Sequence, residues 1–123
     1  MACTSAIISG SASKNGRPLL WKHRDTGVED NFVAKIEAKN AGEFDYVALY
    51  NAEDSIYRDA WLGMNEAGFA IMNTASYNLR EDMLECQMDR EGEFMYHVLG
   101  QCATLQEFEA WIDTYPQPWG VEA

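Results

Sequence analysis

The sequence predicts an α+β fold in which an antiparallel sheet carries a helical hairpin on one face. Short β-favourable runs separated by turn residues fill the first two-thirds of the 123-residue chain. A polar, charged stretch follows, and from about Glu93 the apolar residues recur at helical spacing. Strands followed by helices, rather than alternating with them, favour an antiparallel sheet.

Short apolar and β-branched runs predict the strands. They span residues 4–9, 19–23, 32–38, 44–50, 56–62 and 69–74. The Asn15-Gly16 pair predicts a hairpin turn between the first two strands. The segment from Gly63 to Gly68 has a glycine at each end and predicts the reversal between the last two.

Two amphipathic segments predict the helices. The apolar face of the first runs from Phe94 to Cys102 with helical spacing. The second begins with a capping box from Thr104 to Glu107, in which hydroxyl and carboxylate satisfy each other's free backbone N–H groups. Pro116 ends it, because proline has no N–H to continue the helix.

We expect one domain over residues 1–123. It divides into a strand-rich part (1–77), a charged loop (78–92), a helical hairpin (93–115) and the start of a further strand (119–123). A chain of this length can bury roughly two-thirds of its unfolded surface, which is enough for one core.

Charge and composition exclude several classes of partner. Nine Lys and Arg against 20 Asp and Glu give a net charge of −11, which opposes binding to nucleic acid or an anionic membrane. The apolar runs are far shorter than the roughly 20 residues that cross a bilayer. Cys3, Cys86 and Cys102 show no zinc spacing, so we expect no cofactor and a reducing, cytoplasmic location, unless a removed signal peptide directs the chain to the periplasm or outside the cell.

Cys3 is the residue that carries chemistry. Once Met1 and Ala2 are removed, Cys3 offers a thiol and its own α-amine on one residue. An α-amine with a pKa of about 7.7–8.0 can accept the thiol proton and so acts as a built-in general base. This placement is the one that N-terminal nucleophile enzymes need.

Further motifs extend this pattern. The runs Cys3–Ile8, Ala12–Gly16, Lys22–Asp25 and Gly63–Ile71 resemble the cysteine N-terminal nucleophile hydrolases. Within these, the chain is most similar to the isopenicillin-N acyltransferase-like family, a relative of choloylglycine hydrolase, penicillin V acylase, acid ceramidase and the N-terminal nucleophile dipeptidases. Members of this family are longer, so the resemblance implies that the chain is the N-terminal half of an αββα sandwich and is inactive alone.

The resemblance also implies roles for six residues. Three are catalytic and three bind substrate: Cys3, Asp25 and Asn73, and Lys22, Arg24 and Tyr77. A hairpin would bring residues 22–25 beside Cys3, where a cation favours the thiolate and Asp25 orients the amine. Asn73 falls where these enzymes form the oxyanion hole. Lys22 stands where relatives usually have Arg, so a point charge replaces a planar fork.

The predicted function is hydrolysis or acyl transfer at linear amide C–N bonds through an acyl-enzyme. The substrate would be a small acyl amide or thioester. Two alternatives stay open: a dipeptidase of the same class, and a non-catalytic binding or assembly domain that keeps the fold. As protein partners we expect a second copy of the chain or a further C-terminal half.

Overall fold

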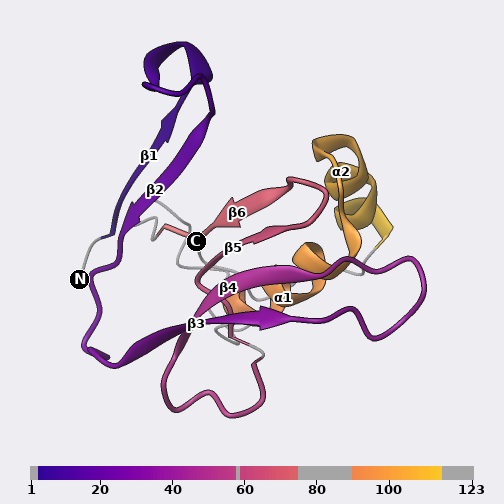
Figure 1. The fold of residues 1–123 in the computed structure, drawn as a ribbon. Coiled ribbons are helices and arrows are strands. Elements are labelled where there is room, and N and C mark those ends of the chain that lie inside the picture. The colour runs from indigo at the N-terminus through magenta and orange to yellow at the C-terminus, as the bar shows by residue number, and fades with distance from the viewer. Residues whose placement is uncertain (1–2, 58, 75–89, 115–123) are drawn as a thin grey trace, which may run out of the picture.

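The computed structural model describes residues 3–57, 59–74 and 90–114. Within these residues the fold is α+β, with two antiparallel sheets and two helices (Figure 1). The elements are β1 (Thr4–Ile8), a 3-10 turn (Gly10–Ala12), β2 (Leu19–His23), β3 (Asn31–Ile36), β4 (Tyr46–Asn51), β5 (Leu62–Asn65), β6 (Ala70–Met72), α1 (Glu91–Gln101) and α2 (Leu105–Thr114).

Strands β3 to β6 form a four-stranded meander in chain order. Alternation along β4 turns Tyr46, Ala48 and Tyr50 to one face, where all three are buried. Met95 and Leu99 of α1 complete this cluster, so α1 packs directly on the sheet. This half of the core follows from period-2 and helical spacing meeting on one face.

Helix α2 extends the core beyond α1. Trp111 of α2 packs with Val98 and Cys102 and with Phe69 from the β5–β6 turn. Its ring also meets that of Phe94 edge to face, with the centroids 5.4 Å apart. The predicted helical hairpin therefore lies on the helix-covered side of the sheet.

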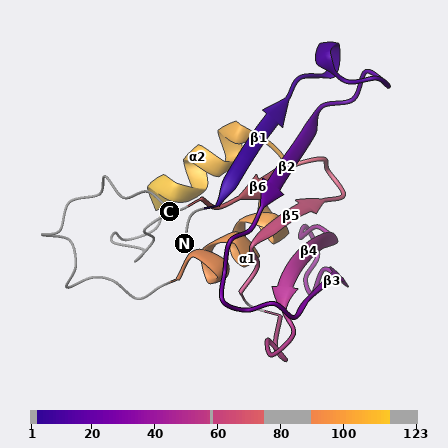
Figure 2. The ribbon, with the colours of Figure 1, turned by 90° about the vertical axis from the view of Figure 1, so that its left-hand side faces the viewer.

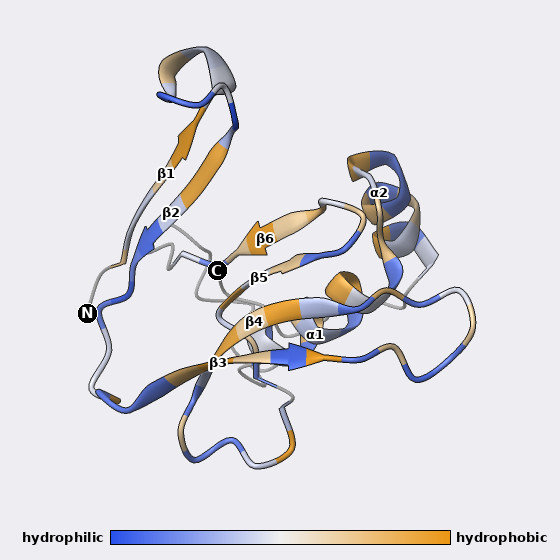
Figure 3. Cartoon of the chain, in the orientation of Figure 1, coloured by the Kyte–Doolittle hydropathy of each residue, from blue (hydrophilic) through white to orange (hydrophobic). Residues whose placement is uncertain are grey.

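The single predicted sheet is in fact two sheets. Strands β1 and β2 pair only with each other and stand away from the meander, with their base near β6 (Figures 1 and 2). Apolar residues colour much of this hairpin orange in Figure 3. The Asn15-Gly16 turn prediction was wrong, because Ile8 pairs with Leu19 across a longer connection. Gly16 does take a positive φ of 73°, inside that connection.

Gly63 lies within a strand rather than in a turn. The predicted strand at 56–62 begins only at Leu62, and Gly63 pairs with Ala48. A Cβ on Gly63 would lie 2.5 Å from Leu99 Cδ1, so the glycine gives α1 room to approach the sheet. The reversal follows at residues 66–69, where Gly68 has φ 90°.

The start of α2 follows the predicted capping box in part. Thr104 Oγ1 accepts a hydrogen bond from the Glu107 N–H at 3.1 Å, as predicted. The Glu107 carboxylate accepts from the Ala103 N–H at 2.6 Å, one residue before the expected donor. Of the predicted charged loop, residues 91–92 belong to α1 and 78–89 lie outside the described residues, as does the predicted strand at 119–123.

A buried amide fastens the sheet to α1. Asn65, 2 % exposed, donates from Nδ2 to the carbonyl oxygens of Leu99 at 3.0 Å and Cys102 at 2.7 Å. Its Oδ1 accepts from the Phe69 N–H at 3.0 Å. One side chain thus satisfies the end of α1 and closes the β5–β6 turn.

We expect Asn65→Ala to lower the free energy of unfolding by about 3 kcal/mol, because it leaves three buried backbone groups without partners. Urea unfolding followed by circular dichroism measures this loss. Gln106→Ala, at an exposed amide on α2, is the control and should change stability by less than about 0.5 kcal/mol. Equal stability of the two variants would contradict the role given to Asn65.

We also expect Gly63→Ala to destabilise the protein by about 1–3 kcal/mol, because the added methyl overpacks against Leu99. Gly100→Ala is the matched control: no atom lies within 4 Å of its added Cβ. On α1 that substitution should stabilise by about 0.5–1 kcal/mol through helix propensity. Thermal unfolding of both variants tests the opposite signs.

Candidate functional site

Lys22 connects the hairpin to the sheet. It is half-buried on β2, where alternation exposes Trp21 and His23 instead. Its Nζ donates to Asn73 Oδ1 at 2.5 Å and to the Trp61 carbonyl oxygen at 3.1 Å. The structure therefore brings together two of the predicted site residues, Lys22 and Asn73, which are 51 positions apart.

Arg24 is held in place by neutral groups. Its Nη1 donates to Asn31 Oδ1 at 2.5 Å and to Asn51 Oδ1 at 2.7 Å. The guanidinium carbon lies 4.3 Å from the centroid of the Trp61 ring, in cation–π geometry. These contacts orient the positive charge of Arg24 without neutralising it.

Cys3 precedes β1 directly and is half-buried, with a free thiol. In the hairpin Thr4 pairs with His23 and Ser5 with Lys22. Continuing this register by one residue places Cys3 opposite Arg24. Because alternate residues share a face, Cys3 falls on the face of the hairpin that carries Lys22 and Arg24.

The electrostatics confirm this neighbourhood. Burial lowers the pKa of Lys22 below its ordinary value; the charge of Cys3 opposes this shift and that of Arg24 adds to it. Burial likewise lowers the pKa of Arg24, again opposed by Cys3. Both cations therefore lie within electrostatic reach of Cys3.

The remaining two predicted residues lie apart from this cluster or beyond the described chain. Asp25 follows Arg24 directly, but its side chain is exposed, two residues after the end of β2. Tyr77 lies outside the described residues. The cluster that the structure shows is thus Cys3, Lys22, Arg24 and Asn73.

Three further residues of the site were missed by sequence reasoning. Trp61 supplies a carbonyl to Lys22 and a ring to Arg24, while Asn31 and Asn51 hold the guanidinium. The Trp61 Nε1 is buried and has no acceptor in the described part of the chain. No local pattern marks these residues, because their distance from Arg24 in the sequence is closed only by the fold.

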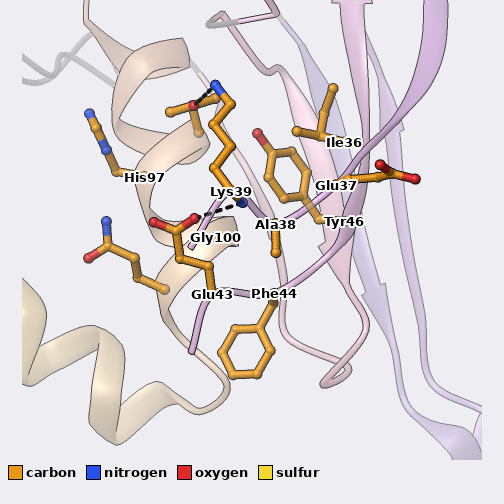
Figure 4. A pocket seen from close by; sticks show the side chains of 11 residues that line it. Ile36, Glu37, Ala38, Lys39, Glu43, Phe44, Tyr46, His97 and Gly100 are labelled. Atoms are coloured by element: carbon orange, nitrogen blue, oxygen red, sulfur yellow. Dashed lines mark hydrogen bonds between the residues drawn. The ribbon is translucent and has the colours of Figure 1, made fainter. Parts of the chain in front are cut away.

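A small pocket far from Cys3 is a poor alternative site. It lies between α1 and the β3–β4 connection, where Lys39 Nζ donates to the Tyr96 hydroxyl at 3.0 Å (Figure 4). The Glu43 carboxylate there accepts from the backbone of Lys39 at 3.1 Å. At about 50 Å³ it is much smaller than typical ligand sites.

Comparisons with known proteins add no assignment. No protein-family model, curated protein or solved structure matches this chain. Neither α1 nor α2 is long and apolar enough to cross a membrane. Among the described residues, His, Cys, Asp and Glu form no group of three that could hold a metal ion. The interpretation of the site therefore depends on its own geometry and chemistry.

We expect Lys22→Gln to slow alkylation of Cys3 by iodoacetamide about three- to tenfold at pH 7.5, because a nearby cation favours the reactive thiolate. Peptide mass mapping separates Cys3 from Cys86 and Cys102. Lys14→Gln, an exposed lysine in the hairpin connection, is the control and should leave the rate unchanged. Identical rates in the two variants would show that Lys22 does not act on the thiol.

Proposed function

We propose that this protein, with Cys3 as its first residue, hydrolyses linear amide C–N bonds or transfers their acyl groups. The observation that supports this proposal best is the convergence of Cys3, Lys22, Arg24 and Asn73 on one face of the hairpin. A thiol, two cations and an amide donor are the groups that acyl transfer through a thioester requires.

In the first half of the reaction, Cys3 Sγ attacks the carbonyl carbon and the thiol proton moves to the α-amine. The tetrahedral intermediate then collapses, the C–N bond breaks, and the leaving amine takes that proton. In the second half, water or an acceptor amine attacks the thioester, releasing the acid or the new amide and regenerating the thiol. Asp25, beside Arg24, is proposed to orient the α-amine.

The contact with Lys22 supports a role for Asn73 in stabilising the oxyanion. An ammonium group only donates hydrogen bonds, so the Asn73 atom facing Lys22 is the oxygen. This fixes the amide and turns its Nδ2 donor away from Lys22. We place that donor, with backbone N–H groups near Asn73, at the developing oxyanion.

Lys22 and Arg24 have different parts in this proposal. The Nζ of Lys22 is engaged with Asn73 and Trp61, so its role is to position Asn73 and to favour the thiolate. Arg24 is stacked on Trp61 and uses Nη1 for two amides, which leaves its other N–H groups to bind a polar group of the substrate. Tyr77 is kept as a proposed substrate contact.

The layer order supports one further proposal on the fold. A helical layer covers one face of the four-stranded sheet, which accounts for two successive layers. We propose that they are the nucleophile-bearing half of an αββα sandwich, as the sequence resemblance implies.

The nucleophile is tested by exposing Cys3 with a fusion protease and incubating the protein with butyryl p-nitroanilide. We expect release of nitroaniline and a butyryl adduct on Cys3 by intact mass, because a thioester links the two half-reactions. The adduct and the turnover should both disappear in Cys3→Ala and when Ala2 still blocks the amine. Unchanged turnover in Cys3→Ala would sink the proposal.

A further inference from the structure

A second, larger cleft lies between the hairpin and the outer face of the meander. Its volume is about 410 Å³, within the range of small-molecule sites. Every residue that lines it is apolar: Pro18, Leu19, Leu20, Val33, Val47, Ala48, Leu49, Leu62, Gly63, Met64 and Ala70. Two separate parts of the chain form its walls, so it is a cleft rather than a flat sheet face.

The sheet wall is the face that α1 leaves uncovered. Val47 of β4 alternates with residues that are buried under α1, and it is opposite Met64 of β5. Val33, Val47 and Met64 are 71 %, 42 % and 51 % exposed. The apolar residues of β2, β4 and β6 that surround this space are orange in Figure 3. Exposed apolar side chains gathered in this way mark a binding surface.

One end of the cleft adjoins the cluster around Cys3. Leu20 and Lys22 are successive residues on the same face of β2, so the apolar wall leads directly to the ammonium group. On the opposite wall, Leu62 follows Trp61, whose carbonyl binds that ammonium. The polar groups therefore stand at one end of a space with apolar walls.

We infer that this cleft binds the acyl part of the substrate and that the substrate class is N-acyl amides with an unbranched alkyl chain. The inference rests on the proposed function, which puts the substrate carbonyl at Cys3. The alkyl chain then extends from Lys22 along Leu20 and Leu62 toward Val47 and Met64. No charged or polar side chain lines this path, so a polar acyl group would lose its hydrogen bonds to water without replacement.

The test measures binding and turnover separately. Binding of acetyl, butyryl, hexanoyl and octanoyl p-nitroanilide to the Cys3→Ala chain is followed by calorimetry, and turnover is measured with Cys3 exposed. We expect affinity to rise about two- to fourfold per added methylene. Met64→Glu should weaken octanoyl binding about tenfold or more and leave acetyl binding unchanged, because it places a charge in the alkyl path.

Two further variants control this comparison. Leu105→Glu adds the same charge at a 66 % exposed leucine on α2, on the helix-covered side of the sheet, and should leave octanoyl binding unchanged. If Met64→Glu shifts the urea midpoint, Val33→Glu repeats the test at a more exposed position of the same cleft.

The outcomes separate this inference from the proposed function. Turnover of the acetyl amide with no dependence on chain length overturns the acyl cleft and leaves the nucleophile in place. Chain-length-dependent binding that Met64→Glu abolishes, without turnover by Cys3, supports the cleft and overturns the proposed function. Equal affinities together with a dimer that Met64→Glu dissociates, measured by sedimentation, would assign the face to contact between copies of the chain and overturn the inference.

Discussion

The ammonium group of Lys22 joins two parts of the molecule that share no strand pairing. The hairpin is a separate two-stranded sheet, and the hydrogen bonds from Lys22 to Asn73 and to the Trp61 carbonyl link it to the meander. The stacking of Arg24 on Trp61 reinforces this link. Both the cluster around Cys3 and the apolar cleft lie between the hairpin and the meander, so both depend on it. A two-stranded ribbon is marginal alone, which makes these contacts important for its position.

The meander supplies the rigid side of the site. Asn65 satisfies the carbonyl groups at the end of α1, and Gly63 gives that helix room to approach. Because both act on the face away from Cys3, the outer face is free to form one wall of the cleft. Stability and the proposed chemistry are thus placed on opposite faces of the same sheet, and Trp61, next to the start of β5, connects them.

The extent to which the site could be predicted follows the distance between its parts in the sequence. Cys3, Lys22 and Arg24 lie on neighbouring strands of one hairpin, and its register alone brings them together. Asn73 was found through a motif. The residues that fix Arg24 were not found, because Asn51 is 27 positions away and nothing local distinguishes it. The turn at Asn15-Gly16 and the role of Gly63 were misjudged because a glycine serves equally in a turn and at a close contact between elements.

The sequence by itself determined the fold class, the first two strands, the helix positions and the capping hydroxyl of Thr104, since each depends on residues within a few positions of one another. Only the tertiary structure decided that the strands divide into two sheets, that Lys22 binds Asn73, and that an apolar cleft ends beside that contact. The physical reason is that local periodicity specifies which face of an element is apolar. Which distant face it meets is set by packing and by hydrogen bonds between side chains far apart in the chain.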